Sequence, residues 1–542
     1  ASLNNLAALY QSQGRYTEVE PLLKQALEIF KKLLGAEHPS VANSLNNLAT
    51  LYQAQGRYQE AEPLYKQALE MRQKLLRAEH PSVLKSLNNL ATLYQAQGRY
   101  QEAEPLYKQV LEMRQKLLGA EHPDVTNSLH SLANLYYLQG KYQEAELLYK
   151  QALEMIQKLL GTEHPDVANS LHSLALLYFA QGKYQEAELL YKQALEMSIK
   201  LLGAEHPDVA TIINNLTLLY SAQGRYTEAE LLCKKSLEMT QKLLGTEHPY
   251  VATSINNLAN LYSAHGRYTE AEPLLKQTLE MYKKLLGAEH PYIATSLNNL
   301  ALLYNAQGRY IEAEPLFRQA LEMRQKLLGA EHPDVANSLN NLAELYQRQG
   351  KYIEAEPLYI QSLEMTKKLL GAEHPDVATS LNYLAGLYYA QGRYTEAEPL
   401  YKQALEMRQK LLGAEHPDIA TTLNNLAKLY QAQGNIASAL QFFERSLEVQ
   451  EKNLTYNLAA GSEPQKEKYL KTLSGAKDDA ISLHLQHAPT NPDAANLSLT
   501  TILRRKGRIL DSTINSLQTI RDNLTPENQK LLNKLTNTRT QL

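Results

Sequence analysis

The chain has 542 residues, too many for one hydrophobic core, so it must contain several domains or a repeat array. Its 55 Lys+Arg and 58 Asp+Glu give a net charge of −3, which offers no basic field for nucleic acid or an anionic membrane. One cysteine excludes a disulfide framework and favours a reducing compartment. Neither a signal peptide nor a membrane-spanning run is visible, so the sequence predicts a cytoplasmic protein.

A fixed period of 42 residues runs through residues 1–452. The string Leu-Asn-Asn-Leu-Ala returns eleven times with small variations, and Glu-His-Pro returns ten times. Such a period is typical of repeat proteins, in which each unit packs on its neighbours. We number the units one to eleven, from the unit of Leu3 to that of Leu423, and the first is truncated.

Each unit contains two stretches with apolar residues at helical spacing. In unit two they run from Val41 to Tyr52 and from Tyr58 to Leu76. The first helix should begin at the proline of Glu-His-Pro, a favoured first helical residue, and end near Gln-Gly. The second should end at Leu-Leu-Gly, where glycine takes a left-handed cap that other residues resist. Arg77 replaces this glycine once and should cost local stability.

The period breaks down after unit eleven, where no further Glu-His-Pro follows Leu447. Residues 453–542 form a second region, for which the sequence predicts helices over 465–473, 476–487, 493–521 and 526–541. Prolines at 489, 492 and 526 separate the last three of these helices. We therefore expect a small helical module at 453–542 that differs from the repeats.

The spacing within a unit resembles the tetratricopeptide (TPR) pattern rather than HEAT, armadillo or propeller repeats. It reads Leu45-x-x-Leu48-Ala49-x-x-Tyr52, then Ala61-x-x-x-Tyr65-x-x-Ala68, then Pro81. The longer unit, with Gly-Arg-Tyr-x-Glu-Ala-Glu-Pro-Leu and Leu-Gly-x-Glu-His-Pro-Asp-Val-Ala, is similar to the repeats of kinesin light chains and their bacterial relatives. The resemblance implies an all-α fold, a right-handed α-solenoid of stacked hairpins over residues 1–452.

The C-terminal region has a resemblance of its own. Residues 469–475, 482–486 and 503–511 resemble the segment that joins repeats to a caspase-like CHAT protease domain in bacterial, especially cyanobacterial, TPR-CHAT proteins. This resemblance implies that the chain could be the sensor arm of a protease whose catalytic CHAT domain lies elsewhere in a longer polypeptide.

No residue pattern predicts catalysis, a cofactor or a metal. Cys233 is the only thiol, and it occupies the core-facing position held by Tyr65 and Phe317 in other units. The histidines of Glu-His-Pro occur once per unit, too far apart to share a zinc ion, and we expect them to cap helices. Phosphate-binding loops and catalytic motifs are absent from the sequence, so no enzyme activity is predicted.

The resemblance places a binding surface on the first helices, at Asn43, Asn46, Asn47, Thr50, Gln53 and their equivalents. Asparagine holds the second position of the Asn-Asn pair in eight of the eleven units. A row of carboxamides, each donor and acceptor, could hold the backbone of an extended peptide. The alternative is that these asparagines are merely polar, solvated or bonded within the helix. The predicted peptide-binding asparagines are Asn46, Asn47, Asn88, Asn89, Asn214, Asn215, Asn256, Asn257, Asn298, Asn299, Asn340 and Asn341.

Units four and five depart from this pattern together. They carry His130, Asn134 and Tyr137, then His172 and Phe179, on the same helix face. Aromatic groups often dominate peptide binding, so these five residues are predicted to form an anchor within the peptide-binding surface. Drift among the copies would explain the change equally well.

The sequence thus favours a protein-interaction scaffold whose ligand is a peptide or partner protein in a concave groove. The first-helix face carries few charges, which favours a mostly neutral ligand. One alternative is regulation of a CHAT protease in an intact longer protein. Another is a structural solenoid that associates with itself through apolar surface exposed at the truncated first unit.

Overall fold

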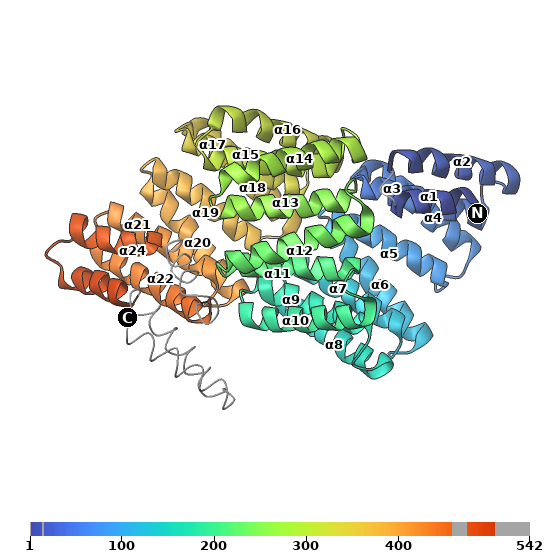
Figure 1. The fold of residues 1–542 in the computed structure, drawn as a ribbon, viewed down its shortest axis with the longest axis horizontal. Coiled ribbons are helices and arrows are strands. Elements are labelled where there is room, and N and C mark those ends of the chain that lie inside the picture. Colours follow the sequence, from blue (N-terminus) through green and yellow to red (C-terminus); the bar gives the residue numbers. More distant parts are fainter. Residues whose placement is uncertain (1, 13–15, 458–473, 505–542) are drawn as a thin grey trace, which may run out of the picture. The chain divides into compact units, whose positions relative to one another are not determined.

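The computed structural model describes residues 2–12, 16–457 and 474–504. These residues form helices joined by short turns, and no β-strand occurs among them. Figure 1 shows the helices as successive hairpins stacked side by side. The predicted all-α fold, an α-solenoid of stacked hairpins, is therefore confirmed.

Apart from the truncated first unit, the first helices begin at the expected proline. They end before Gln-Gly, or before His265-Gly266 in unit seven. They are α1 Ser2–Ser12, α3 Pro39–Ala54, α5 Pro81–Ala96, α7 Pro123–Leu138, α9 Pro165–Ala180, α11 Pro207–Ala222, α13 Pro249–Ala264, α15 Pro291–Ala306, α17 Pro333–Arg348, α19 Pro375–Ala390 and α21 Pro417–Ala432. The second helices are α2 Tyr16–Leu34, α4 Tyr58–Leu75, α6 Tyr100–Leu118, α8 Tyr142–Leu160, α10 Tyr184–Leu202, α12 Tyr226–Leu244, α14 Tyr268–Leu286, α16 Tyr310–Leu328, α18 Tyr352–Leu370, α20 Tyr394–Leu412 and α22 Ile436–Asn457.

The chain divides into two compact bodies. The large body comprises Ala1–Ser221 and Glu228–Gly413, and the small body comprises Ala222–Thr227 and Ala414–Leu542. In the small body, α24 (Ser474–Ser482) continues into a π-helical turn at Leu483–His487, and a further helix covers residues 492–504. Asp479 of α24 accepts a hydrogen bond from Asn424 (3.0 Å) and pairs with Lys428 (2.8 Å), both on α21. The helices predicted over 465–473 and 526–541 lie outside the described residues.

Small and large apolar side chains alternate in the core of each hairpin. Ala49, Ala61 and Ala68 are completely buried, and this lets the two helices approach closely. Tyr65 lies between them at 2 % exposure, and its hydroxyl group contacts Thr50 Oγ1 at 2.9 Å. The residues that define the repeat are therefore those that hold each hairpin together.

The glycine after each second helix has the expected positive φ but not a left-handed helical conformation. Gly119 has φ 86° and ψ 161°, a region that only glycine enters easily. Where Arg77 replaces the glycine, α4 ends one residue earlier, and Leu76 terminates it with φ −132°. The chain thus avoids a strained arginine by shortening the helix.

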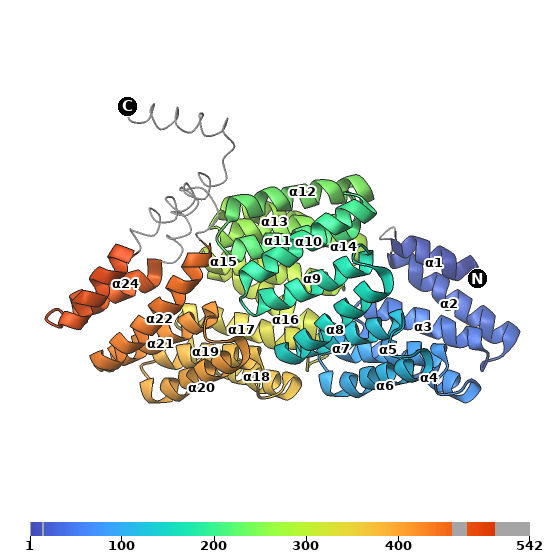
Figure 2. The ribbon, with the colours of Figure 1, turned by 90° about the horizontal axis from the view of Figure 1, so that it is seen from below.

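Units far apart in sequence touch along one edge of the large body. The glycine that follows a first helix packs against the proline that opens a first helix six units later, in the pairs Gly56–Pro291, Gly98–Pro333 and Gly140–Pro375. A Cβ atom on Gly98 would lie 2.7 Å from the ring of Pro333, too close for any side chain. We call these three contacts the inter-turn seam. In the same body α2 contacts α14 (Figure 1, Figure 2). In addition, α4 contacts α16.

Buried histidines reinforce the seam. Nε2 of His332 donates a hydrogen bond to the carbonyl oxygen of Ala96, and Nε2 of His374 donates to that of Leu138, both at 2.9 Å. Nδ1 of each ring accepts from a backbone N–H in the first turn of its own helix, so the neutral ring is fully bonded. Burial lowers the pKa of His332 and favours this neutral form. The expected capping role of the Glu-His-Pro histidines is confirmed.

Candidate functional site

The predicted binding positions lie on the first helices, which their N-terminal residues fix in place. Proline holds the first helical position, and the preceding histidine accepts a hydrogen bond from the second, as His38 does from Ser40 N at 3.1 Å. In α3, Leu45 and Leu48 face the core and are buried. Asn43 and Asn47 lie on the opposite side of the helix and are exposed. The spacing therefore places Asn43 and Asn47 on one exposed face of α3.

Carboxamides of neighbouring units form a ladder on this face. The second asparagine of one unit donates through Nδ2 to Oδ1 of the first asparagine of the preceding unit. The rungs are Asn89 to Asn46 (2.9 Å), Asn299 to Asn256 (3.1 Å) and Asn341 to Asn298 (2.9 Å). We call these six residues the asparagine ladder. Its hydrogen bonds join units, rather than residues of one helix, and so hold neighbouring first helices in register.

The two asparagines of a pair differ in exposure. Asn46, Asn298 and Asn340 at the first position are buried, at 6 %, 7 % and 8 % exposure. At the second position Asn5 and Asn47 are exposed and the other asparagines are half-buried. A second-position asparagine in the ladder uses one N–H, which leaves its other N–H and its Oδ1 for a ligand or water. Asn88, Asn214, Asn215, Asn256 and Asn257 are half-buried on the same face.

Histidines replace asparagine rungs in units four and five. His130 Nε2 lies 2.8 Å from Ser170 Oγ of unit five, and His172 Nε2 accepts from Asn215 Nδ2 of unit six at 2.6 Å. Burial lowers the pKa of both histidines, which favours the neutral rings that these contacts need. The two histidines therefore hold units together as the asparagines do elsewhere.

A tyrosine interrupts the ladder at unit ten. Tyr383 stands where the donor asparagine would be, and Oδ1 of Asn340 is buried without a hydrogen-bond partner among the described residues. The Tyr383 ring instead stacks on Tyr359, with centroids 6.0 Å apart. An orphaned buried acceptor costs free energy, so the interruption lowers stability here.

The predicted aromatic anchor residues pack on the second helices of their own units. The Tyr137 ring lies 5.9 Å from that of Tyr142, and Phe179 lies 5.8 Å from Tyr184, between ring centroids. Both are half-buried, whereas Asn134 is exposed. The structure thus puts an aromatic edge and a polar group on the first-helix face in units four and five.

Two leucines on this face were not among the predicted residues. Leu218 and Leu302, at the position of Thr50, are 53 % and 36 % exposed. They add apolar surface beside the asparagines of units six and eight. The sequence signal was a leucine where most other units have a polar residue. Helical periodicity alone does not reveal this difference.

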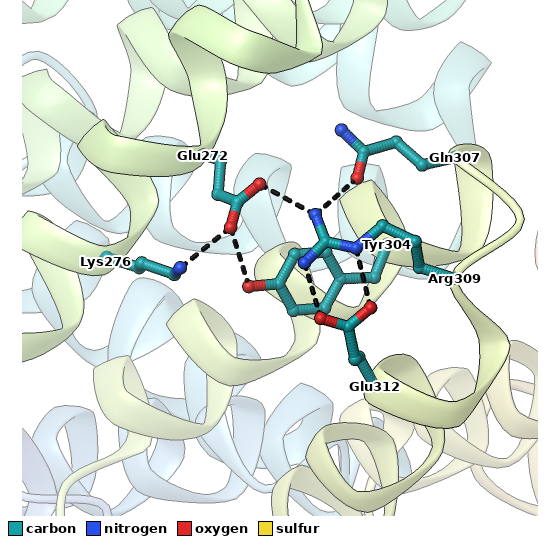
Figure 3. Close-up of polar contacts among 6 residues, drawn as sticks. All are labelled: Glu272, Lys276, Tyr304, Gln307, Arg309 and Glu312. Atoms are coloured by element: carbon teal, nitrogen blue, oxygen red, sulfur yellow. Dashed lines mark hydrogen bonds and ion pairs between the residues drawn. The ribbon is translucent and has the colours of Figure 1, made fainter.

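A cluster of charged groups links unit seven to unit eight (Figure 3). Glu272 Oε2 accepts from Arg309 at 2.8 Å, while its Oε1 accepts from Lys276 at 2.7 Å and from the Tyr304 hydroxyl group at 3.0 Å. The guanidinium group of Arg309 lies 4.0 Å above the Tyr304 ring and also pairs with Glu312. Hydrogen bonds from Lys276 and then from Arg309 and Tyr304 outweigh burial and lower the pKa of Glu272 to about 2.

Replacing Glu272 by glutamine should lower the free energy of unfolding at neutral pH by roughly 1 kcal/mol, since the site is partly exposed. Because the folded pKa lies below the usual value of 4.5, the contribution of Glu272 is complete above that pH. It is lost as the pH falls from 4.5 towards 2, so the difference between wild type and variant should shrink there. Urea unfolding across this range would measure it.

Glu280→Gln provides the matched control. Glu280 pairs with Lys283 at 2.9 Å, but its side chain is 72 % exposed. It should lower stability by no more than about 0.5 kcal/mol. Equal effects of the two substitutions would show that the Glu272 cluster does not couple the units.

Cys233 occupies the core, as its position in the repeat predicts. Its side chain is completely buried, and burial raises the pKa of the thiol to about 12. A thiol in this state is a packing group rather than a nucleophile.

Among the described residues, no three His, Cys, Asp or Glu side chains gather as a metal site would require. Within the same part of the chain, every helix is too short or too polar to cross a membrane.

Comparison with known families identifies the repeat. The tetratricopeptide-repeat model matches residues 1–74, 82–158, 148–200, 190–232, 208–284, 292–368, 334–410 and 376–452. A second tetratricopeptide-repeat model matches residues 256–327. No curated protein matches the chain in sequence.

Several solved structures are similar to parts of the chain. The nearly identical TPR-like repeats of a protein assigned as a kinesin light chain in Podosopora anserina are 42% identical, covering 37% of this chain and 94% of that one, with a TM-score of 0.33. BtubC (BKLC) from P. vanneervenii is 27% identical over 41% of this chain and 89% of its own, with a TM-score of 0.35. A human IFIT1 dimer with PPP-AAAA is 18% identical, covering 79% of this chain and 94% of that one, with a TM-score of 0.41.

Proposed function

The chain belongs to the tetratricopeptide-repeat family, a class of protein-interaction scaffolds, and on that basis we propose that it binds a peptide or partner protein in a concave groove lined by its first helices. Direct contacts between neighbouring first helices support this side as the concave one. Such contacts join α13 to α15, α15 to α17, and α17 to α19. In a curved stack, elements on the concave side lie closest together.

The asparagine ladder is the observation that carries the proposal. Each rung fixes the orientation of its side chains before a ligand arrives, so little side-chain entropy remains to be lost on binding. The second-position asparagines then present one N–H and one carbonyl oxygen per unit. An extended peptide offers the complementary pair of backbone groups at each residue.

The charge of the surface indicates the class of ligand. Among its few charged residues, Arg348 and Glu344 pair with each other at 2.8 Å. Leu218 and Leu302 add apolar contacts beside the carboxamides. The ligand is therefore a mostly neutral, extended segment with some apolar side chains, and weak contacts to several units add through effective concentration.

A comparison of two kinds of asparagine tests the proposal. Asn299 holds a rung, but Asn257 does not, since Oδ1 of its would-be partner Asn214 has no hydrogen-bond partner among the described residues. Peptides selected from a neutral displayed library would be titrated against Asn257→Ala and Asn299→Ala. Both should weaken binding about threefold to tenfold, through loss of one or two hydrogen bonds. Only Asn299→Ala should also lower the unfolding midpoint.

The control is Gln143→Ala, on the exposed surface of the second helix α8. It should change neither binding nor stability. If Asn257→Ala bound the selected peptides as tightly as wild type, the asparagines would serve only to hold the units together, and the proposed surface would be wrong.

The remaining features favour a non-catalytic scaffold that works in the cytoplasm. The only thiol is buried, which suits a reducing compartment and leaves it without a nucleophilic role. The resemblance of the tail supports one alternative, in which the repeats restrain a CHAT protease domain in a longer protein. An open reading frame without a caspase-like domain downstream would contradict that alternative.

A further inference from the structure

The inter-turn seam joins two unlike edges. One, the turn edge, consists of the glycine and the last carbonyl group of a first helix, as at Ala96 and Gly98. The other, the proline edge, consists of the histidine and proline that open a first helix, as at His332 and Pro333. The seam uses the turn edges of units two to four and the proline edges of units eight to ten.

The turn edges of later units are uncovered. Gly56, Gly98 and Gly140 are buried, whereas Gly266, Gly308, Gly350 and Gly392 are exposed. No described atom comes within 4 Å of a Cβ atom built on any of these four. Their φ angles, 71–75°, match the 68–72° of the seam glycines, so their backbone already has the conformation that receives a proline.

The proline edges of early units are uncovered as well. Pro39, Pro81 and Pro123 are exposed, and the His122 and His164 side chains are 38% and 36% exposed, against 8% for His332. Nδ1 of His122 and His164 still caps its own helix, as in the seam, so that Nε2 faces outwards with a proton to donate.

We infer that a second copy of this chain docks its proline edge on the turn edge of the first and repeats the inter-turn seam between molecules. Both halves of the contact exist on one chain, and three intramolecular examples show that they fit. The contact joins different surfaces of the two copies, so it leaves one edge of each kind uncovered and can propagate into an open chain. It does not involve the truncated first unit.

The aspartate and tyrosine that surround the seam recur at some of the uncovered edges. Burial, and then the charge of Asp334, which follows Pro333, raise the pKa of Tyr58. The Tyr58 ring stacks on His332, with the two ring centroids 6.1 Å apart. The uncovered proline edges carry Asp124 and Asp166 at the same position, and the uncovered turn edges carry Tyr310 and Tyr352. A contact between copies would therefore restore the same Asp, His and Tyr grouping at two successive units.

Two blocked variants test the inference. Pro81→Glu with Pro123→Glu blocks the proline edge, and glutamate at the first helical position suits the helix dipole. Gly308→Asn with Gly350→Asn blocks the turn edge, because asparagine tolerates positive φ but adds a side chain where the proline would sit. Gln143→Glu, on an exposed second-helix surface, is the control.

Sedimentation velocity over a wide range of concentration should show wild type and control forming dimers and longer chains. Each blocked variant should associate at least about tenfold more weakly. A mixture of the two should form a one-to-one dimer and nothing larger, since each retains the edge that the other lacks. Circular dichroism would establish that the variants are folded. A monomeric wild type, or a mixture that does not pair, would overturn the inference.

Discussion

Alanine at Gly98 should lower the free energy of unfolding by about 2–5 kcal/mol, whereas alanine at Gly350 should lower it by about 1–2 kcal/mol. Both glycines follow a first helix, and their φ angles are 71° and 74°. Alanine therefore meets the same backbone strain at both. The difference lies in what surrounds the new methyl group.

At Gly98 a Cβ atom would meet two carbons of the Pro333 ring at 2.7 Å, while at Gly350 nothing described lies within 4 Å. Proline cannot yield by changing rotamer, so the seam must open or the backbone must shift. Urea unfolding in dilute solution, where copies do not associate, would measure the two effects. Equal losses would mean that units three and nine do not touch in solution.

The fold could be predicted from the sequence because the same helical pattern recurs in eleven units. Proline begins nearly every first helix and glycine follows most helices, and the apolar positions between them fit only a helical hairpin. Even the odd unit with Arg77 follows local rules, since a side chain at positive φ is avoided by ending the helix early. These are interactions between residues close in the chain.

The seam could not be predicted in this way. Whether Gly98 meets Pro333 depends on small rotations between neighbouring units, added over six of them, and no single unit encodes the sum. All eleven units carry the same turn glycine, yet it is buried in only some of them. The sequence therefore identifies the edges but not their pairing.

The sequence indicates which asparagines share the first helices, but not how their side chains bond to one another. Helical spacing places Asn298 and Asn299 on the first-helix face, as the structure shows. Spacing does not reveal the stagger between units, through which Asn299 reaches back to Asn256 and Asn298 receives Asn341. The same stagger explains why His172 can replace an asparagine, since its Nε2 can accept from Asn215.

Truncating Phe317 to alanine should lower the free energy of unfolding by about 3–5 kcal/mol. Phe317 lies between α15 and α16 at 1 % exposure. Six other units have tyrosine here, and its hydroxyl group can bond to the first helix, as Tyr65 does to Thr50. Phenylalanine lacks that group, so its removal measures packing alone. Ile311→Ala on the same helix, where the side chain is 90 % exposed, should cost no more than about 0.5 kcal/mol.

Amide hydrogen exchange would show which units are destabilised by Phe317→Ala. In a simple stack each unit depends on its neighbours, so exchange should accelerate in units seven to nine and remain slow in unit five. Unit eight also supplies Pro291 to the seam, where it covers Gly56 of unit two. Exchange should therefore accelerate around Gly56 as well, although more than two hundred residues separate it from the substitution. If only units seven to nine responded, the hairpins would behave as a linear stack and the seam would contribute little to stability.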